Sequence, residues 1–218
     1  MYELLIIVAF SAFAFYNLNV HDDEFANTSR KIGERVGKLW DIAHRSMKEN
    51  RMLRAEKALI TILKIDERNA AAYNRLGILY AKQKEYRDAI DCFEIASSLE
   101  ATPSSLHNLG LIYYETENYD KAAIAFEQAI KLEGALATRH VAYAKVQEKL
   151  GNHKLMIQEL EVAAELEPTK EIYELLKRAY DHQGMVEESD KIVAKLKKMT
   201  RQPKSAKRLL RPARRVII

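Results

Sequence analysis

The chain has 218 residues, of which 48% are hydrophobic, with 7 Gly and 4 Pro. This composition excludes a disordered protein and a turn-rich β-fold, and it favours an all-α class. The net charge of +4 is unevenly divided. Residues 191–218 hold eleven Lys or Arg and no acid, whereas the first 190 residues hold 24 basic and 31 acidic groups. A basic end on an acidic body predicts a surface-binding tail.

The first segment in chain order is apolar. Residues 4–20 carry no charge, and as a helix they would span about 25 Å, close to the roughly 30 Å hydrocarbon core of a bilayer. We therefore predict a membrane-anchor helix at 1–20 and a juxtamembrane linker at 21–35. Two alternatives remain: a signal peptide, which Glu3 and the lack of a preceding Lys or Arg disfavour, and a helix packed on the fold.

Basic residues follow this segment and none precedes it. By the positive-inside rule, the sequence predicts a single-pass membrane protein whose main domain faces the cytoplasm. A soluble cytoplasmic or an exported protein is the alternative.

Two segments 33 residues apart share one pattern. Its first copy consists of Tyr73, Leu76, Gly77, Tyr80, Ala89 and Phe93, and its second of Leu106, Leu109, Gly110, Tyr113, Ala122 and Phe126. This pattern resembles the tetratricopeptide repeat, in which an aromatic residue, Leu-Gly and Tyr are followed by Ala, Phe and later Pro over about 34 residues. Weaker copies flank the two, and Pro168 takes the proline position of one.

The resemblance implies a right-handed α-solenoid of about five antiparallel helix pairs over residues 36–199. The units are expected at 36–69, 70–102, 103–136, 137–169 and 170–199. Glycines would let the helices approach closely while aromatic rings fill the space between neighbouring helices. The expected repeat core comprises Tyr73, Leu76, Gly77, Tyr80, Ala89, Phe93, Leu109, Gly110, Tyr113, Ala122, Phe126 and Pro168.

In this family the first helix of each pair lines a concave groove. Counting from the repeat phase, we expect the groove residues to include Trp40, His44, Asn74, Ile78, Lys82, His107, Leu111, Tyr114, Lys145 and Arg178. Their mixture of apolar and charged side chains suits a protein or peptide partner. The predicted function is therefore a non-catalytic scaffold or adaptor. The clamp that binds chaperone C-termini is not expected, since Asn74 and Ile78 replace its Lys and Asn.

No enzyme signature competes with this interpretation. The six histidines are scattered without a zinc motif, and the sequence has neither a phosphate-binding glycine loop nor a nucleophile elbow. The single cysteine, Cys92, is expected to be a small core residue. We predict no catalytic residues, metal site or cofactor.

The last segment, residues 200–218, is a basic tail. Its cationic side chains include Lys204, Lys207, Arg208, Arg211, Arg214 and Arg215. Near a membrane they would attract anionic lipid, and nucleic acid is the rival partner. A solvated tail that binds nothing is the third possibility. The alternative function is thus a soluble or exported repeat protein whose tail binds RNA, the ribosome or anionic lipid. The oligomeric state stays open.

Overall fold

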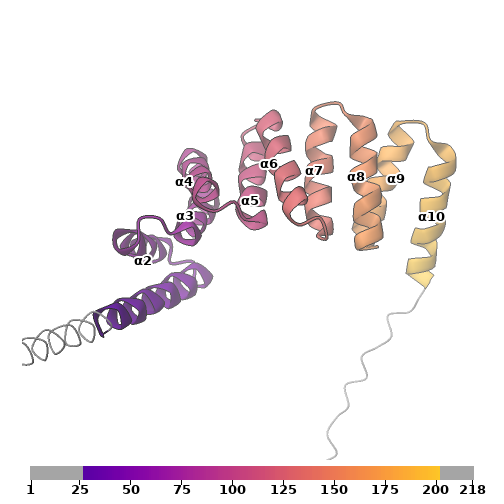
Figure 1. Ribbon diagram of the computed structural model, residues 1–218. Coiled ribbons are helices and arrows are strands. Elements are labelled where there is room, and N and C mark those ends of the chain that lie inside the picture. Colours follow the sequence, from indigo (N-terminus) through magenta and orange to yellow (C-terminus); the bar gives the residue numbers. More distant parts are fainter. Residues whose placement is uncertain (1–26, 202–218) are drawn as a thin grey trace, which may run out of the picture. The chain divides into compact units, whose positions relative to one another are not determined.

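The computed structural model describes residues 27–201, and every regular element in that range is an α-helix. The predicted all-α class is confirmed for this part of the chain. The fold divides into two compact units, Met1–Ala101 and Thr102–Ile218. Each is described by itself (Figure 1).

Unit 1 contains a helix over residues 27–48, followed by α2 (Met52–Ile65), α3 (Ala70–Gln83) and α4 (Tyr86–Leu99). α3 packs on both α2 and α4. The buried aliphatic residues of this core are Ala43, Ala55, Ala58, Leu59, Ile62, Ala72, Leu76 and Leu79. The predicted linker at 21–35 is helical from residue 27 onward, because this charged stretch contains no proline to stop the helix.

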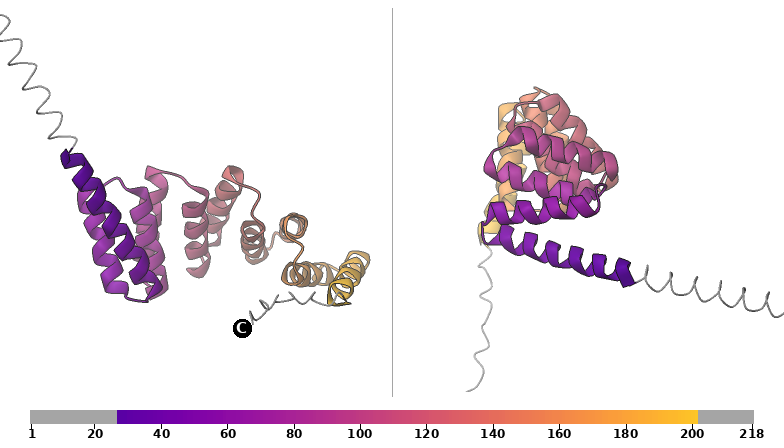
Figure 2. Two further views of the ribbon diagram at one scale, coloured as in Figure 1. Left: turned by 90° about the horizontal axis from the view of Figure 1, so that it is seen from below. Right: turned by 90° about the vertical axis from the view of Figure 1, so that its left-hand side faces the viewer.

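Unit 2 contains three helix pairs that follow one another in chain order. They are α5 (Pro103–Glu115) with α6 (Tyr119–Leu132), α7 (Ala137–Lys149) with α8 (His153–Leu166), and α9 (Lys170–His182) with α10 (Val186–Arg201). α6 also packs on α7, and α8 packs on α9. Figures 1 and 2 show this order from three sides. Each pair thus covers the apolar face of the next pair.

The turn inside each helix pair has the same backbone geometry throughout the described chain. One residue with positive φ follows the first helix, at Asn50, Lys84, Glu117, Gly151 and Gly184. The next backbone N–H donates to the carbonyl oxygen five residues earlier at 2.8–3.0 Å. The accepting oxygens belong to Ser46, Tyr80, Tyr113, Gln147 and Tyr180. This bond closes a Schellman motif. Its recurrence every 33 or 34 residues defines five helix pairs between residues 27 and 201.

Glycine and phenylalanine fix the separation of the helices in two pairs. Phe93 and Phe126 are 1% and 0% exposed. A Cβ atom added at Gly77 would lie 2.7 Å from Cε1 of Phe93, and one at Gly110 would lie 2.9 Å from Cζ of Phe126. Real Cβ contacts are longer, so an alanine at either position requires the buried ring to move.

Two tyrosines join their helix to the helix that precedes it. Tyr80 Oη donates to Oε1 of Glu56 on α2 at 2.9 Å, and Tyr180 Oη donates to Oε1 of Glu161 on α8 at 2.5 Å. Burial, and next the hydrogen bond to the carboxylate, raise the pKa of both phenols. These tyrosines therefore hold consecutive pairs together within their units.

The core prediction is wrong for Pro168, which is exposed. It precedes Thr169, whose side-chain oxygen accepts from the backbone N–H of Ile172 and caps α9. Proline therefore occupies a boundary between two helices, where its missing N–H costs nothing, and it does not pack.

Cys92 lies half-buried on α4 and belongs to no disulfide. Burial, and next the carboxylates of Asp91 and Asp88, raise the pKa of its thiol from 9.0 to about 11. The thiolate is the reactive form, so at neutral pH we expect iodoacetamide to alkylate Cys92 about 100-fold more slowly than free cysteine. Mass spectrometry of timed samples measures the rate, which should recover in urea. A native rate equal to that of free cysteine would contradict this account.

Within residues 27–201, no helix is both long and apolar enough to cross a bilayer. The predicted anchor at 4–20 and the basic residues from Lys204 to Arg215 lie outside the described part of the chain. A single right-handed solenoid running through all five pairs stays a prediction.

Candidate functional site

The first helices of the three pairs in unit 2 line a cavity of about 540 Å³. α5, α7 and α9 supply most of the lining, because the short turns put every first helix on the same side of the stack. The lining residues are His107, Leu111, Tyr114, Glu115, Phe126, Thr138, Val141, Ala142, Lys145, Glu167, Thr169, Glu171, Ile172 and Leu175. We name this cavity the α5–α7–α9 groove.

The groove combines an apolar floor with acidic edges. Phe126 and Ile172 are buried, Val141 and Leu175 are half-buried, and Leu111 is 39% exposed. Such a floor offers apolar area to a ligand side chain.

The charged side chains at the edges are mostly acidic. Glu115, Glu167 and Glu171 are exposed, and none of them forms an ion pair with another residue in the described range. Lys145 supplies the opposing positive charge in the lining. The edges therefore favour a ligand that carries positive charge on either side of an apolar group.

His107 is a half-buried titratable residue in the groove. Its ring meets the Phe126 ring edge-on, with centroids 5.4 Å apart. Its Nδ1 atom is buried and has no hydrogen-bond partner within the described residues. Burial, and next the positive charge of Arg139, lower the pKa of His107 below its usual 6.5. The neutral ring therefore lines the groove at neutral pH.

This shift makes stability depend on pH. Because the pKa of His107 is lower in the folded chain, the folded chain binds fewer protons than the unfolded chain as the pH falls below about 6.5. The free energy of unfolding should then decrease with acidification, and His107→Gln should reduce that decrease. Urea unfolding of both proteins above and below this pH measures the difference. Equal losses on acidification in the two proteins would contradict the assignment.

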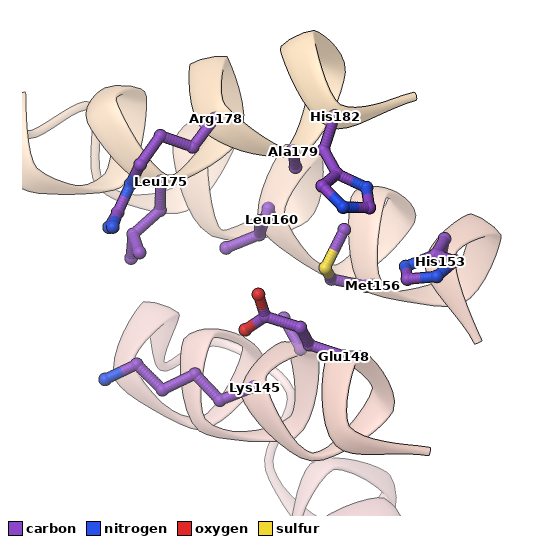
Figure 3. A pocket seen from close by; sticks show the side chains of 10 residues that line it. Lys145, Glu148, His153, Met156, Leu160, Leu175, Arg178, Ala179 and His182 are labelled. Atoms are coloured by element: carbon purple, nitrogen blue, oxygen red, sulfur yellow. The ribbon is translucent and has the colours of Figure 1, made fainter. Parts of the chain in front are cut away.

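A second cavity, of about 410 Å³, adjoins the groove between α7, α8 and α9 (Figure 3). Lys145 and Leu175 line both cavities, so the two cavities are neighbours. Figure 3 shows the Glu148 carboxylate directed into this second cavity from α7. At its other side the rings of His153 and His182 lie 5.6 Å apart, between centroids, with their planes inclined by 38°.

The structure divides the predicted groove residues between the two units. In unit 2, His107, Leu111, Tyr114 and Lys145 line the α5–α7–α9 groove, and Arg178 lines the adjoining cavity. The other five lie in unit 1, on the helix over residues 27–48 and on α3. They are Trp40, His44, Asn74, Ile78 and Lys82. Trp40 and His44 line a separate cavity of about 280 Å³ with Met47 and Arg75.

Counting by repeat phase missed part of the site. Glu167 and Thr169 come from the connection between α8 and α9, and Glu171 and Ile172 from the first turn of α9. The phase count follows one stripe along each first helix, so it does not reach residues at helix ends or in connections. A search of the loops next to the stripe for charged side chains would have found Glu167.

Between residues 27 and 201, no three His, Cys, Asp or Glu side chains are arranged to hold a metal ion. What the groove offers is apolar surface, charge and a buried ring nitrogen, which are features for binding.

Comparison with known proteins identifies the repeat. The family model of the tetratricopeptide repeat matches residues 68–132. This part of the chain therefore consists of tetratricopeptide repeats. A search of curated proteins found no match.

Solved structures of other tetratricopeptide proteins share the fold. A MamA crystal structure is 22% identical, with a TM-score of 0.69, and the match covers 78% of this chain and 97% of that one. MamA from Desulfovibrio magneticus RS-1 is 15% identical with a TM-score of 0.70, covering 78% and 98%. YrrB, described as a TPR protein with an unusual peptide-binding site, is 19% identical with a TM-score of 0.63, covering 75% and 84%. At these identities the likeness concerns the fold.

Proposed function

We propose that this tetratricopeptide repeat protein is a non-catalytic scaffold that binds a peptide segment of a partner protein in the α5–α7–α9 groove. The observation that carries the proposal is the lining of that cavity by three successive first helices, with an apolar floor and carboxylates that have no ion-pair partner among the described residues. The peptide-binding site of the structurally similar YrrB supports the same use of the fold.

The chemistry of the groove restricts the ligand. Its floor favours one or two aliphatic side chains, whose burial provides most of the affinity. Glu115 lies on α5 at one side, and Glu167 and Glu171 lie at α9 on the other. A peptide with Leu or Ile bracketed by Lys or Arg would satisfy both features, whereas an acidic peptide would meet repulsion.

A peptide-library selection against the purified chain tests this proposal. Leu111→Glu puts a charge on the apolar floor, and we expect it to weaken the selected peptides by about 10- to 100-fold, the equivalent of one lost aliphatic contact. Fluorescence anisotropy measures the affinity.

Ile124→Glu is the matched control, since Ile124 is 56% exposed on α6 and does not line the groove. Both variants should keep the circular dichroism of the wild type. Equal affinity of the Leu111 and Ile124 variants for the selected peptides would contradict the proposed site.

We further propose that residues 4–20 anchor the protein in a membrane with the repeats in the cytoplasm. The uncharged sequence and the basic residues after it support this. Membrane fractions washed with high salt and then with alkaline carbonate test it: an anchored protein stays in the pellet, and Val8→Asp should release it. Release by salt alone would favour the soluble alternative, in which the basic tail binds RNA, the ribosome or anionic lipid.

A further inference from the structure

We propose that residues 202–218 of this chain dock in its own α5–α7–α9 groove and must be displaced before a partner binds. This inference rests on the proposed function of the groove and names a regulator for it. Four observations carry it: where α10 ends, the length of the segment that follows, its charge, and the pattern of its apolar residues.

The register of α9 against α10 places the end of α10 level with one end of the groove. Lys195 Nζ lies 5.4 Å from the centroid of the Tyr173 ring, and Ser189 Oγ donates to Oδ1 of Asp181 at 2.5 Å. The two helices are therefore antiparallel, and extending this register brings the end of α10 level with Glu167. Figure 1 agrees, since the α7–α8 and α9–α10 turns lie at one end of the stack and α10 ends at the other. That other end carries Glu167, Thr169 and Glu171 of the groove.

The segment is long enough to cross the groove. Residues 202–218 are seventeen residues, which extend to at most about 56–60 Å. Leu209 and Leu210 follow Arg201 by eight and nine residues, which extend to at most about 26–32 Å, and neighbouring helices pack about 8–10 Å apart, so the path from α10 past α9 to α7 is about 20 Å. An intramolecular contact is therefore possible without stretching the chain.

Charge complementarity favours this occupant. The segment carries six Lys or Arg and no acid, and the groove edges carry three carboxylates that pair with no other described residue. Arginine suits such a site because its planar guanidinium can form two parallel hydrogen bonds to one carboxylate. Lys170 is the cation of α9 that lies nearest to Glu167 and Glu171 in the sequence, and its ammonium already pairs with Glu174 at 3.3 Å. The end of the groove that lies level with the end of α10 is therefore mainly acidic.

The apolar residues of the segment match the floor. Leu209 and Leu210 are bracketed by Arg208 and Arg211. This arrangement of two aliphatic side chains between two cations is the ligand pattern that the groove favours. We assign the Arg208–Arg211 tetrapeptide as the part that enters the groove, with its leucines against Val141 on α7 and Leu175 on α9.

Tethering turns a weak contact into an effective competitor. A short flexible linker gives an effective concentration of about 1 mM, so a segment with an affinity of about 100 µM would weaken a partner's apparent affinity about tenfold. Replacing the leucines of the segment should restore the partner's affinity by the same factor, because the groove itself is unchanged.

The test uses the full-length chain in uncharged detergent and a fluorescent peptide of residues 202–218. Leu209→Asp with Leu210→Asp empties the groove, so this variant should bind the peptide about tenfold more tightly than the wild type does. In that background, Glu167→Lys with Glu171→Lys should abolish binding of the peptide. Glu165→Lys with Glu187→Lys is the matched control, because both residues are exposed on unit 2 outside the groove and the charge change is the same.

Four results would overturn the inference. The peptide could bind the wild type and the leucine variant equally, or the control charge reversals could weaken it as much as the groove reversals do. The wild type could also form a dimer that the leucine variant lacks, which would assign the segment to the groove of a second copy. Binding of the peptide to anionic vesicles or RNA, with none to the emptied groove, also rejects it. The proposed function is judged separately, since library-selected peptides that still respond to Leu111→Glu would uphold the groove.

Discussion

Phe126→Ala is expected to lower the free energy of unfolding by about 3–5 kcal/mol, as for other fully buried aromatic rings. The ring is 0% exposed, it packs against Gly110, and it meets the His107 ring edge-on. Alanine would leave a cavity between α5 and α6 that these neighbours cannot fill, because both helices are also held by other parts of the stack. The urea midpoint measured by circular dichroism gives the loss. Since Phe126 also lines the groove, peptide affinity should fall as well.

The contact between Phe126 and Gly110 provides a sharper version of this test. Gly110→Ala alone should destabilise the protein by about 1–3 kcal/mol through overpacking, offset by up to about 1 kcal/mol from the better helix propensity of alanine. In the double variant the ring is absent and the new methyl group has room, so the combined loss should be smaller than the sum of the two single losses. Additive losses would show that the ring and the glycine do not restrain each other.

The pairing of glycine with phenylalanine could be predicted from the sequence because both recur with the repeat period. The resemblance to the tetratricopeptide repeat implied the antiparallel helix pairs and the positions that face the core. A repeated pattern sets the residue types at the positions where each helix pair packs against the next pair. The left-handed turn residues follow the same period, although Asn50, Lys84 and Glu117 are not the glycines that such a conformation favours.

Features that occur once in the chain could not be predicted this way. Residues 27–35 extend the first helix, and Pro168 lies exposed at a helix boundary. Neither position has a counterpart in the two strong copies of the pattern. The acidic edge formed by Glu167 and Glu171 also depends on one connection between pairs. The period therefore predicts the scaffold, and residues outside it give the groove its charge.

At the connection between α6 and α7, residues that depart from the repeat pattern also determine a buried contact. Arg139 Nη1 donates to the backbone oxygen of Glu133 at 2.7 Å and pairs with its Oε2 at 2.8 Å. His140 Nε2 lies 2.8 Å from the carbonyl oxygen of Gly134, and its Nδ1 lies 2.7 Å from Oε2 of Glu159 on α8. These two side chains tie the connection to the α7–α8 pair. They thereby set where α7 lies in the groove wall.

His140→Phe is accordingly expected to destabilise the protein by about 1–3 kcal/mol, the cost of removing the hydrogen bonding of the two ring nitrogens in a largely buried site. The repeat pattern predicts the opposite, because His140 takes the position of Tyr73, Leu106 and Tyr173, where an apolar ring should fit. The Glu159 side chain is 16% exposed, so some solvent reaches it and the loss should stay below that of a fully buried ion pair. Urea unfolding again measures the change.

Two companion variants separate the hydrogen bonds of His140 from its shape. Glu159→Gln keeps an oxygen that can accept from the ring, so its cost should be well below that of His140→Phe. In His140→Phe with Glu159→Leu, the carboxylate that lost its donor is gone, and part of the stability should return because matched apolar groups can replace a buried polar pair. If His140→Phe alone were as stable as the wild type, packing would decide this position, and the α6–α7 connection would need another restraint. Peptide affinity should follow stability through the series, because these contacts hold α7, which lines the groove, against α8 and the α6–α7 connection.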